Sequence, residues 1–328
     1  MRMNIVACMV AVTLAACLAS AASAAPILYS DNFDANTAAN YTVNQDADTT
    51  VTFAYDYSAD GIPSAPGSLG GTTRGVKFTA NNGDATAAAA AVNISPTGQS
   101  FSGDYVLRFQ SWLNANGPFP AGGAGSTQFF TAGVGTDGDD VQKSSGSASG
   151  AWFAGSNEGN SGIDYRAYLN IALEGPTSSV YAAPDVVGPP AINRRSANNP
   201  YYHVAFPGGQ MAPLSQQTAA PLVQTGALKP GALGFEWRDV EISKIGGEVT
   251  WTIDGLEIAS FPNPTLTGSN VFVGHWDVFN SIAGNPEFNF GVVDNLEVER
   301  IPEPTSVALA MLSMLGLVAT ARRRRQLA

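Results

Sequence analysis

Residues 235–261 constrain the fold most, because three apolar-rich segments there are separated by two turn dipeptides. Gly246-Gly247 and Asp254-Gly255 accept positive φ at little cost, which is what two-residue β-hairpin turns require. The sequence therefore predicts a three-stranded meander, with strands at 235–245, 248–253 and 256–261.

Alternation of apolar and polar side chains predicts further strands elsewhere in the chain. In residues 105–113, Leu107 and Phe109 face one way while Arg108 and Gln110 face the other, so we expect a strand with one buried face. Similar patterns predict strands at 163–171, 271–276 and 288–298. No amphipathic helix of two full turns and no fixed-period repeat is found after the first 25 residues.

Composition agrees with a β-rich fold. The 328 residues include 35 Gly and 20 Pro, which favour turns between short strands over helices. The Pro-, Ser- and Gln-rich stretch at 176–232 is typical of long loops or an insertion. We therefore expect a single all-β sandwich domain at 25–300.

Charge and cysteine content exclude several functions for this domain. Arg2 and the four arginines at 322–325 belong to the ends, so 25–321 holds 11 of the 16 basic residues and all 27 acidic ones, a net charge of −16. That charge repels phosphate backbones and argues against a nucleic-acid partner. Cys8 and Cys17 both precede the domain, which excludes disulfide and thiolate chemistry within it.

The N-terminal residues 1–24 predict a signal peptide. A short basic start precedes an apolar run, and Ala22-Ser23-Ala24 gives the small residues that signal peptidase requires. An alternative is a lipobox ending at Cys17, which would make that cysteine the lipidated first residue. Either reading predicts export.

The C-terminal segment 301–328 has three parts in a fixed order. Pro302-Glu303-Pro304 is followed by an apolar stretch at 305–321, which as a helix reaches about 26 Å and predicts a short transmembrane span. The basic cluster that follows should remain on the cytoplasmic side. It consists of Arg322, Arg323, Arg324 and Arg325.

This order of motif, helix and arginines resembles the PEP-CTERM proteins, which are exported bacterial proteins recognised by an exosortase. The match covers about the last 28 residues and is carried by Pro302, Glu303 and Pro304. The resemblance implies processing by signal peptidase and exosortase, an inner-membrane anchor before processing, and then a place at the cell surface or in an extracellular matrix.

Short motifs in the body resemble the concanavalin A-like, or LamG-like, jelly rolls. They are Asp31-Asn-Phe-Asp34, Trp251-Thr-Ile-Asp-Gly255 and Val293-Asp-Asn-Leu-Glu-Val298. The resemblance implies a single jelly-roll β-sandwich. Lectins, carbohydrate-binding modules and glycosidases share this fold, so it does not choose between them.

One group of carboxylates bears on the glycosidase alternative. Glu236, Asp239 and Glu241 approach the Glu-x-Asp-x-Glu pattern of glycosidases with this fold. In a regular strand, however, Asp239 and Glu241 share a face and Glu236 points to the other. We therefore predict no catalytic residues and no enzyme activity.

The polar faces of two predicted strands carry the residue types that bind sugars. Aromatic rings stack on the apolar face of a pyranose, and amides, arginines and carboxylates bind its hydroxyls. The candidates are Arg108, Gln110, Trp112, Arg166, Tyr168 and Asn170. The alternative is that Trp112 and Tyr168 fill a second core layer or lie under a loop.

Three carboxylates are candidates for a structural calcium site. Asp31, Asp34 and Asp294 would supply hard oxygen ligands if the two ends of the domain meet. The alternative for Asp294 is an Asx turn. No other cofactor is expected.

These features predict an exported, non-catalytic β-sandwich with an extracellular polysaccharide as its partner. The alternatives are a glycoside hydrolase and a purely structural matrix protein. An aromatic platform would favour binding, and paired carboxylates in a cleft would favour hydrolysis.

Overall fold

The computed structural model describes residues 26–81, 83, 89–220 and 223–301. Leu28–Glu299 forms a compact unit, and the account below concerns this unit. Of the second unit, only residues 26–27 and 300–301 are described. The predicted signal peptide, sorting motif, transmembrane span and arginine cluster all lie outside the described residues.

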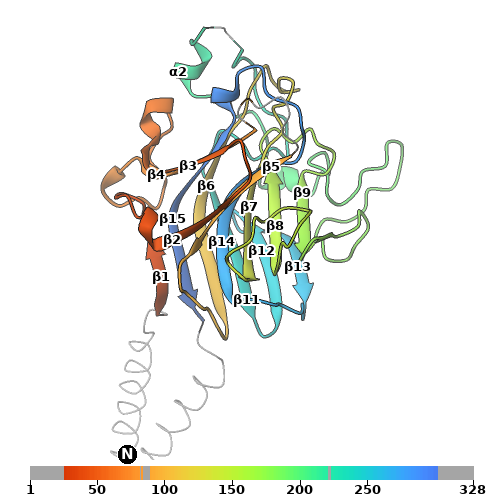
Figure 1. Ribbon diagram of the computed structural model, residues 1–328. Helices are drawn as coiled ribbons and strands as arrows, with labels where there is room; N and C mark the ends of the chain where they lie inside the picture. Colours follow the sequence, from red (N-terminus) through yellow and green to blue (C-terminus); the bar gives the residue numbers. More distant parts are fainter. Residues whose placement is uncertain (1–25, 82, 84–88, 221–222, 302–328) are drawn as a thin grey trace, which may run out of the picture. The chain divides into compact units, whose positions relative to one another are not determined.

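Two antiparallel sheets make up the unit, so the predicted all-β sandwich is confirmed (Figure 1). The first sheet contains, in spatial order, β13 (Leu256–Pro262), β12 (Glu248–Ile253), β11 (Arg238–Ile245), β6 (Tyr105–Asn114), β15 (Phe290–Arg300), β4 (Arg74–Ala80) and β3 (Thr49–Asp56), with β1 (Ile27–Asp31) paired to β15. The second contains β10 (Ala172–Leu173), β9 (Tyr165–Leu169), β8 (Ala151–Ser156), β7 (Phe129–Thr136), β14 (Asn270–Asp277), β5 (Ala90–Pro96) and β2 (Tyr41–Gln45).

The meander predicted from the turn dipeptides is present as β11, β12 and β13. Both turns use the left-handed backbone region, with φ of 59° and 88° at Gly246 and Gly247 and of 50° and 77° at Asp254 and Gly255. Strand β11 begins at Arg238 rather than at 235, and Phe235 itself has a φ of 59° that interrupts an extended strand.

The main core lies between the sheets and is built from their inward-facing side chains. Phe109 of β6 lies 6.2 Å from Phe130 of β7, measured between ring centroids, and Trp251 of β12 stacks on Phe153 of β8 at 5.1 Å. These contacts join the two sheets, because each ring pair takes one member from each.

Two smaller apolar clusters cover parts of the outer faces. Trp112 packs edge-on against Trp237 beside Tyr57 in the first cluster, and Trp152 stacks on Tyr168 in the second. The expectation of a single buried face on β6 is therefore wrong, because loops cover the end of its outer face. Arg108 is the one residue of this strand that is not buried.

The stretch at 176–232 forms loops, as its composition predicts. Its described residues contain the 3-10 helix η4 (Tyr202–Val204), the four-residue helix α2 (Leu214–Gln217) and an isolated bridge between Tyr181 and Ala259. The other short 3-10 helices are η1 (Ala38–Asn40), η2 (Tyr57–Asp60), η3 (Leu69–Gly71) and η5 (Pro286–Phe288). Among the described residues, no helix is both long and apolar enough to cross a membrane.

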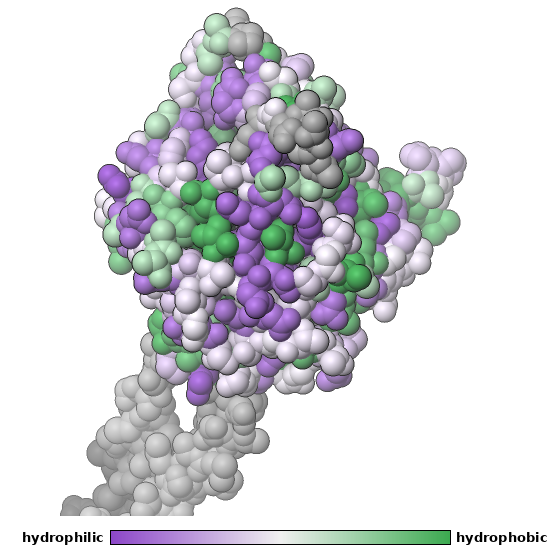
Figure 2. Space-filling model, in the orientation of Figure 1, coloured by the Kyte–Doolittle hydropathy of each residue, from purple (hydrophilic) through white to green (hydrophobic). Residues whose placement is uncertain are grey.

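On the face drawn in Figure 2, hydrophobic residues form separate small areas between hydrophilic ones.

Candidate functional site

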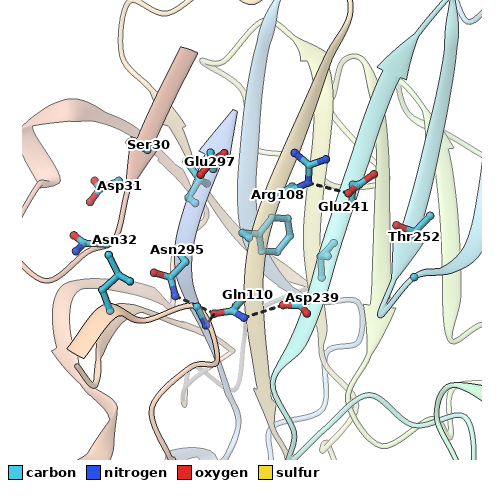
Figure 3. A pocket seen from close by; sticks show the side chains of 16 residues that line it. Ser30, Asp31, Asn32, Arg108, Gln110, Asp239, Glu241, Thr252, Asn295 and Glu297 are labelled. Atoms are coloured by element: carbon cyan, nitrogen blue, oxygen red, sulfur yellow. Dashed lines mark hydrogen bonds and ion pairs between the residues drawn. The ribbon is translucent and has the colours of Figure 1, made fainter. Parts of the chain in front are cut away.

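A polar groove of about 970 Å³ lies on the outer face of the first sheet. Its floor comes from β11, β6 and β15, with β1 and the turn around Leu69 on one side and β12 on the other (Figure 3). The lining residues are Ser30, Asp31, Asn32, Gly67, Leu69, Arg108, Phe109, Gln110, Asp239, Val240, Glu241, Thr252, Gly255, Asn295, Leu296 and Glu297.

The register between β6 and β11 assembles the centre of this groove. Arg108 lies opposite Glu241, and Gln110 lies opposite Asp239. Side chains directly opposite each other on one face of a sheet interact. Arg108 Nε accordingly donates to Glu241 Oε2 at 2.9 Å, and Gln110 Nε2 donates to Asp239 Oδ1 at 2.8 Å. Arg108 also forms an ion pair with Glu299 of β15.

Strand β15 reaches the groove through a break in its alternation. Val293 and Leu296 both belong to the main core. In a regular strand, two residues three positions apart point to opposite faces of the sheet. Asn295 between them has a φ of 51°, in the left-handed region that asparagine tolerates better than most residues. Asn295 and, two residues later, Glu297 therefore line the groove.

The Gln110 amide links the groove to the loop beside it. Its Oε1 accepts hydrogen bonds from the Gly67 backbone N at 2.8 Å and from Asn295 Nδ2 at 2.9 Å, while its Nε2 donates to Asp239. Asn295 Nδ2 also donates to Ser68 Oγ at 3.0 Å. Both lone pairs of the Gln110 oxygen are occupied, so the amide is held in one orientation.

Several acceptor oxygens of the groove residues have no partner within the described ranges. They are Asp239 Oδ2, Glu241 Oε1, Asn295 Oδ1 and both oxygens of Glu297. In contrast, the amide nitrogens of Gln110 and Asn295 and two of the three guanidinium nitrogens of Arg108 already donate to neighbours. The groove thus presents mainly hydrogen-bond acceptors.

Only two of the three carboxylates that resemble a glycosidase motif lie in the groove. Asp239 and Glu241 line it, whereas Glu236 does not and pairs instead with Arg238 at 2.9 Å. The Arg238 side chain is 5% exposed and also binds Asp254. Glu236 precedes the first residue of β11, so no bulge within the strand carries it into the groove.

The six predicted sugar-binding residues do not form one surface. Arg108 and Gln110 lie in the groove, but Trp112 is 4% exposed and packs against Trp237, so it offers no stacking face to a sugar. Trp112 is therefore not a sugar-binding residue, and the alternative that it fills a second core layer is confirmed, because the residues packed with it cover its ring.

The other three predicted residues lie on β9 of the second sheet or in the turn that follows it. Arg166 lies over the ring of Phe129, and Tyr168 is fully buried, with its ring 4.0 Å from that of Trp152. Asn170 uses its side-chain oxygen to accept the Gly150 N–H at 3.0 Å. All three therefore stabilise the second sheet and its turn, and none lines the groove.

The three predicted calcium ligands are engaged with neighbours. Asp31 accepts from the Phe33 backbone N and from the Tyr41 hydroxyl, and Asp34 accepts from Asn32. In the described part of the chain, no group of three or more His, Cys, Asp or Glu side chains is arranged to hold a metal ion.

Asp294 is fully buried, and both of its oxygens accept hydrogen bonds. Oδ2 accepts from the Tyr57 hydroxyl at 3.0 Å and from Ser68 Oγ at 2.8 Å, and Oδ1 accepts from the Asn295 backbone N at 2.7 Å. Burial raises the pKa of Asp294 to about 6. Both oxygens of Asp294 are thus occupied by donors from within the protein, so the arrangement does not fit a calcium ligand set.

Two more carboxyls and one imidazole are buried away from the groove. Burial raises the pKa of Glu158 to about 7 and that of Asp277 to about 6. Burial also lowers the pKa of His275 to about 3, and its Nε2 lies 2.6 Å from Gln128 Oε1. His275 is therefore a core residue.

Asn295, Glu297 and Leu69 line the groove but were not predicted to do so. The sequence signal for the first two is the pair Asp294-Asn295, which follows the apolar residues Val292 and Val293 directly, since Asn is enriched at positive φ and marks a break in alternation. Leu69 comes from a loop, and nothing in the sequence pattern indicates that this loop borders β15.

No family model matches the chain, and no curated protein matches it. Among solved structures, a protein of unknown function with a galectin-like fold from Bacillus subtilis is 9% identical, with 85% of this chain and 97% of that one covered, at a TM-score of 0.40. A structure from work on endo-acting O-glycanases of the human gut microbiota is 10% identical, with 84% and 100% covered, at 0.42. The Ca²⁺- and mannose-bound domain of VIP36 is 8% identical, with 80% and 83% covered, at 0.40. At such low identity, these likenesses carry no information on what this chain binds.

Proposed function

We propose that the chain is an exported surface or matrix protein whose β-sandwich binds polysaccharide without cleaving it. The observation that carries the proposal is the polar groove on β6, β11 and β15, in which hydrogen bonds hold the side chains of Arg108, Gln110, Asp239, Glu241 and Asn295 in place before any ligand arrives. Because these rotamers are already fixed, little side-chain entropy is lost when a ligand binds.

The groove suits a polyhydroxylated ligand in size and in chemistry. Its volume of about 970 Å³ lies within the range of small-molecule sites, about 300–1,000 Å³. Sugar hydroxyls donate hydrogen bonds, and the unpartnered oxygens of Asp239, Glu241 and Asn295 accept them. The Arg108 guanidinium supplies a donor of fixed orientation.

We also propose that the sandwich is a jelly roll of the concanavalin A-like or LamG-like type. Its strand order supports this, because distant parts of the chain are neighbours in both sheets. Strand β15 lies between β6 and β4, and β14 lies between β7 and β5.

Binding is tested by titrating the full-length chain with neutral oligosaccharides in a calorimeter. We expect weak saturable binding that Asp239→Ala reduces several-fold, because Asp239 is an exposed groove acceptor. Glu257→Ala, on β13 and outside the groove, is the matched control and should bind like the unaltered chain. Absence of binding to every oligosaccharide tested, neutral or amine-bearing, would refute the proposal.

Glycoside hydrolysis is a second candidate, favoured by one observation. Asp239 and Glu241 share a strand face in the groove, and Glu297 lines the same groove. A retaining glycosidase needs two carboxyls about 5–5.5 Å apart, and an inverting one needs about 6.5–9.5 Å. Release of reducing ends that Glu241→Gln abolishes would replace the binding proposal with this one.

Export and sorting are part of the proposal and rest on the sequence of the two ends. Signal peptidase would remove residues 1–24, and the span at 305–321 would hold the chain in the inner membrane until an exosortase acts at Pro302-Glu303-Pro304. Proline keeps its preceding residue out of a helix, so the motif would be extended just outside the lipid.

In an exosortase-containing host, we expect the surface-released protein to lack Arg322 to Arg325, as read from its intact mass. Glu303→Ala should leave the chain membrane-bound and full-length at its C-terminus. A released form that still carries the four arginines would show that the segment is a permanent anchor.

A further inference from the structure

We propose that the groove selects neutral and, more strongly, amine-bearing polysaccharides, and that it rejects polyanionic ones. This inference rests on the proposed function and adds the chemical class of the ligand. It follows from the charges that line the groove, from the direction of its hydrogen bonds and from one exposed aliphatic side chain.

The charge of the groove is the first observation. Four lining residues are carboxylates and one is a guanidinium, a formal charge of −3. The single cation, Arg108, is already paired with Glu241 and Glu299. An incoming uronate or sulfate group would therefore meet carboxylates and no unpaired cation on the groove walls, whereas an ammonium group would be attracted.

The direction of the hydrogen bonds is the second observation. Gln110 Nε2 already donates to Asp239, and Asn295 Nδ2 already donates to Ser68 and to the side-chain oxygen of Gln110. What the groove leaves unpartnered in the described ranges is mainly acceptors. A ligand that donates, through hydroxyl or ammonium groups, therefore finds more partners in the groove than carboxylate or sulfate groups, which only accept.

Glu297 is the residue on which selection for an amine should depend most. It lines the groove from β15, and neither of its oxygens has a hydrogen bond or ion pair among the described residues. Asp239 and Glu241 each have one oxygen held by a partner, and Asp31 has both held. Glu297 is thus the carboxylate with the most unsatisfied capacity in the groove.

The exposed side chain of Leu69 is the third observation, because an aliphatic group can contact the ring of a sugar but adds nothing to the binding of a simple cation. Its side chain lines the groove and is 89% exposed, which is unusual for a leucine that serves only packing. The glycines that follow it meet no atom within 4 Å of an added Cβ, so the turn stands free. An exposed aliphatic group beside polar acceptors matches the alternation of C–H and O–H groups on a pyranose.

The test compares three oligosaccharides of equal length on the full-length chain at about pH 6, where amino sugars carry charge: oligoglucosamine, its fully N-acetylated form and oligogalacturonate. We expect the amine form to bind most tightly, the acetylated form more weakly and the uronate form not at all. The preference for the amine form should shrink at ~0.5 M salt, because screening weakens charge attraction.

Three variants separate the groove from the general acidity of the chain. Glu297→Gln should weaken oligoglucosamine about threefold and leave the acetylated form unchanged. Glu257→Gln removes the same charge outside the groove and should change neither. Leu69→Ala should weaken both sugars but not the binding of spermine, a polyamine without a ring.

If the acetylated form binds but the amine form binds no tighter, or if Glu257→Gln acts like Glu297→Gln, the selectivity inference is overturned while polysaccharide binding stands. If no oligosaccharide binds, the proposed function itself fails. Tighter binding of oligogalacturonate than of either other sugar overturns the inference directly.

Discussion

Asn295 serves both the backbone of β15 and the groove, and two substitutions separate these roles. Its φ of 51° suits glycine and penalises a β-branched residue. Both Asn295→Gly and Asn295→Val lose the bonds to Ser68 and Gln110, so the difference between them isolates the backbone. We expect the free energy of unfolding of the valine variant to be about 1–3 kcal/mol lower than that of the glycine variant, as measured by denaturant titration. Equal stabilities would show that β15 does not need a left-handed residue there.

At the scale of the element, the hairpin turn at Gly246 tests how far local chemistry sets the meander. Gly246 has a φ of 59°, and a Cβ added there would meet no atom within 4 Å. Gly246→Val should therefore destabilise the fold by about 1–2 kcal/mol through backbone strain alone. Gly284→Val is the control, since Gly284 also faces open space but lacks a positive φ, and it should stay within about 0.5 kcal/mol of the parent. A loss of stability as large in the control would assign the effect to side-chain exposure.

The same turns show which features of an element the sequence can predict. Hairpin dipeptides and alternation act between near neighbours in the chain, so the meander and β6 were predicted within a few residues. The pairing of Arg108 with Glu241, in contrast, depends on a contact between residues far apart in sequence. The placement of Arg108 in one sheet and Arg166 in the other depends on such contacts too. Alternation states which side chains share a face but not which strand lies beside them. The burial of Trp112 likewise depends on distant segments of the chain, which no local pattern identifies.

At the scale of the whole molecule, buried carboxyls determine how stability should change with pH. Burial raises the pKa of Glu158 from 4.5 to about 7, and that of both Asp277 and Asp294 from 3.8 to about 6. Between about pH 4 and pH 7, the folded chain therefore binds more protons at these sites than the unfolded chain does. Linkage then requires the free energy of unfolding to fall as pH rises through this window. Repulsion among the many carboxylates of the acidic chain acts in the same direction.

We accordingly expect the chain to melt at a higher temperature at about pH 5 than at about pH 8. Each unit of difference in pKa between the folded and unfolded states corresponds to about 1.4 kcal/mol, so the combined change is several kcal/mol. Glu158→Gln gives the internal check. It keeps an oxygen for the Thr127 hydroxyl and removes the carboxyl with the highest raised pKa. The variant should gain stability relative to the parent at about pH 8 and show a flatter pH dependence, because a neutral amide has no charge to desolvate. A parent chain whose melting temperature is the same at both pH values, or a variant with an unchanged slope, would mean that water or rearranged neighbours solvate Glu158 in the folded protein.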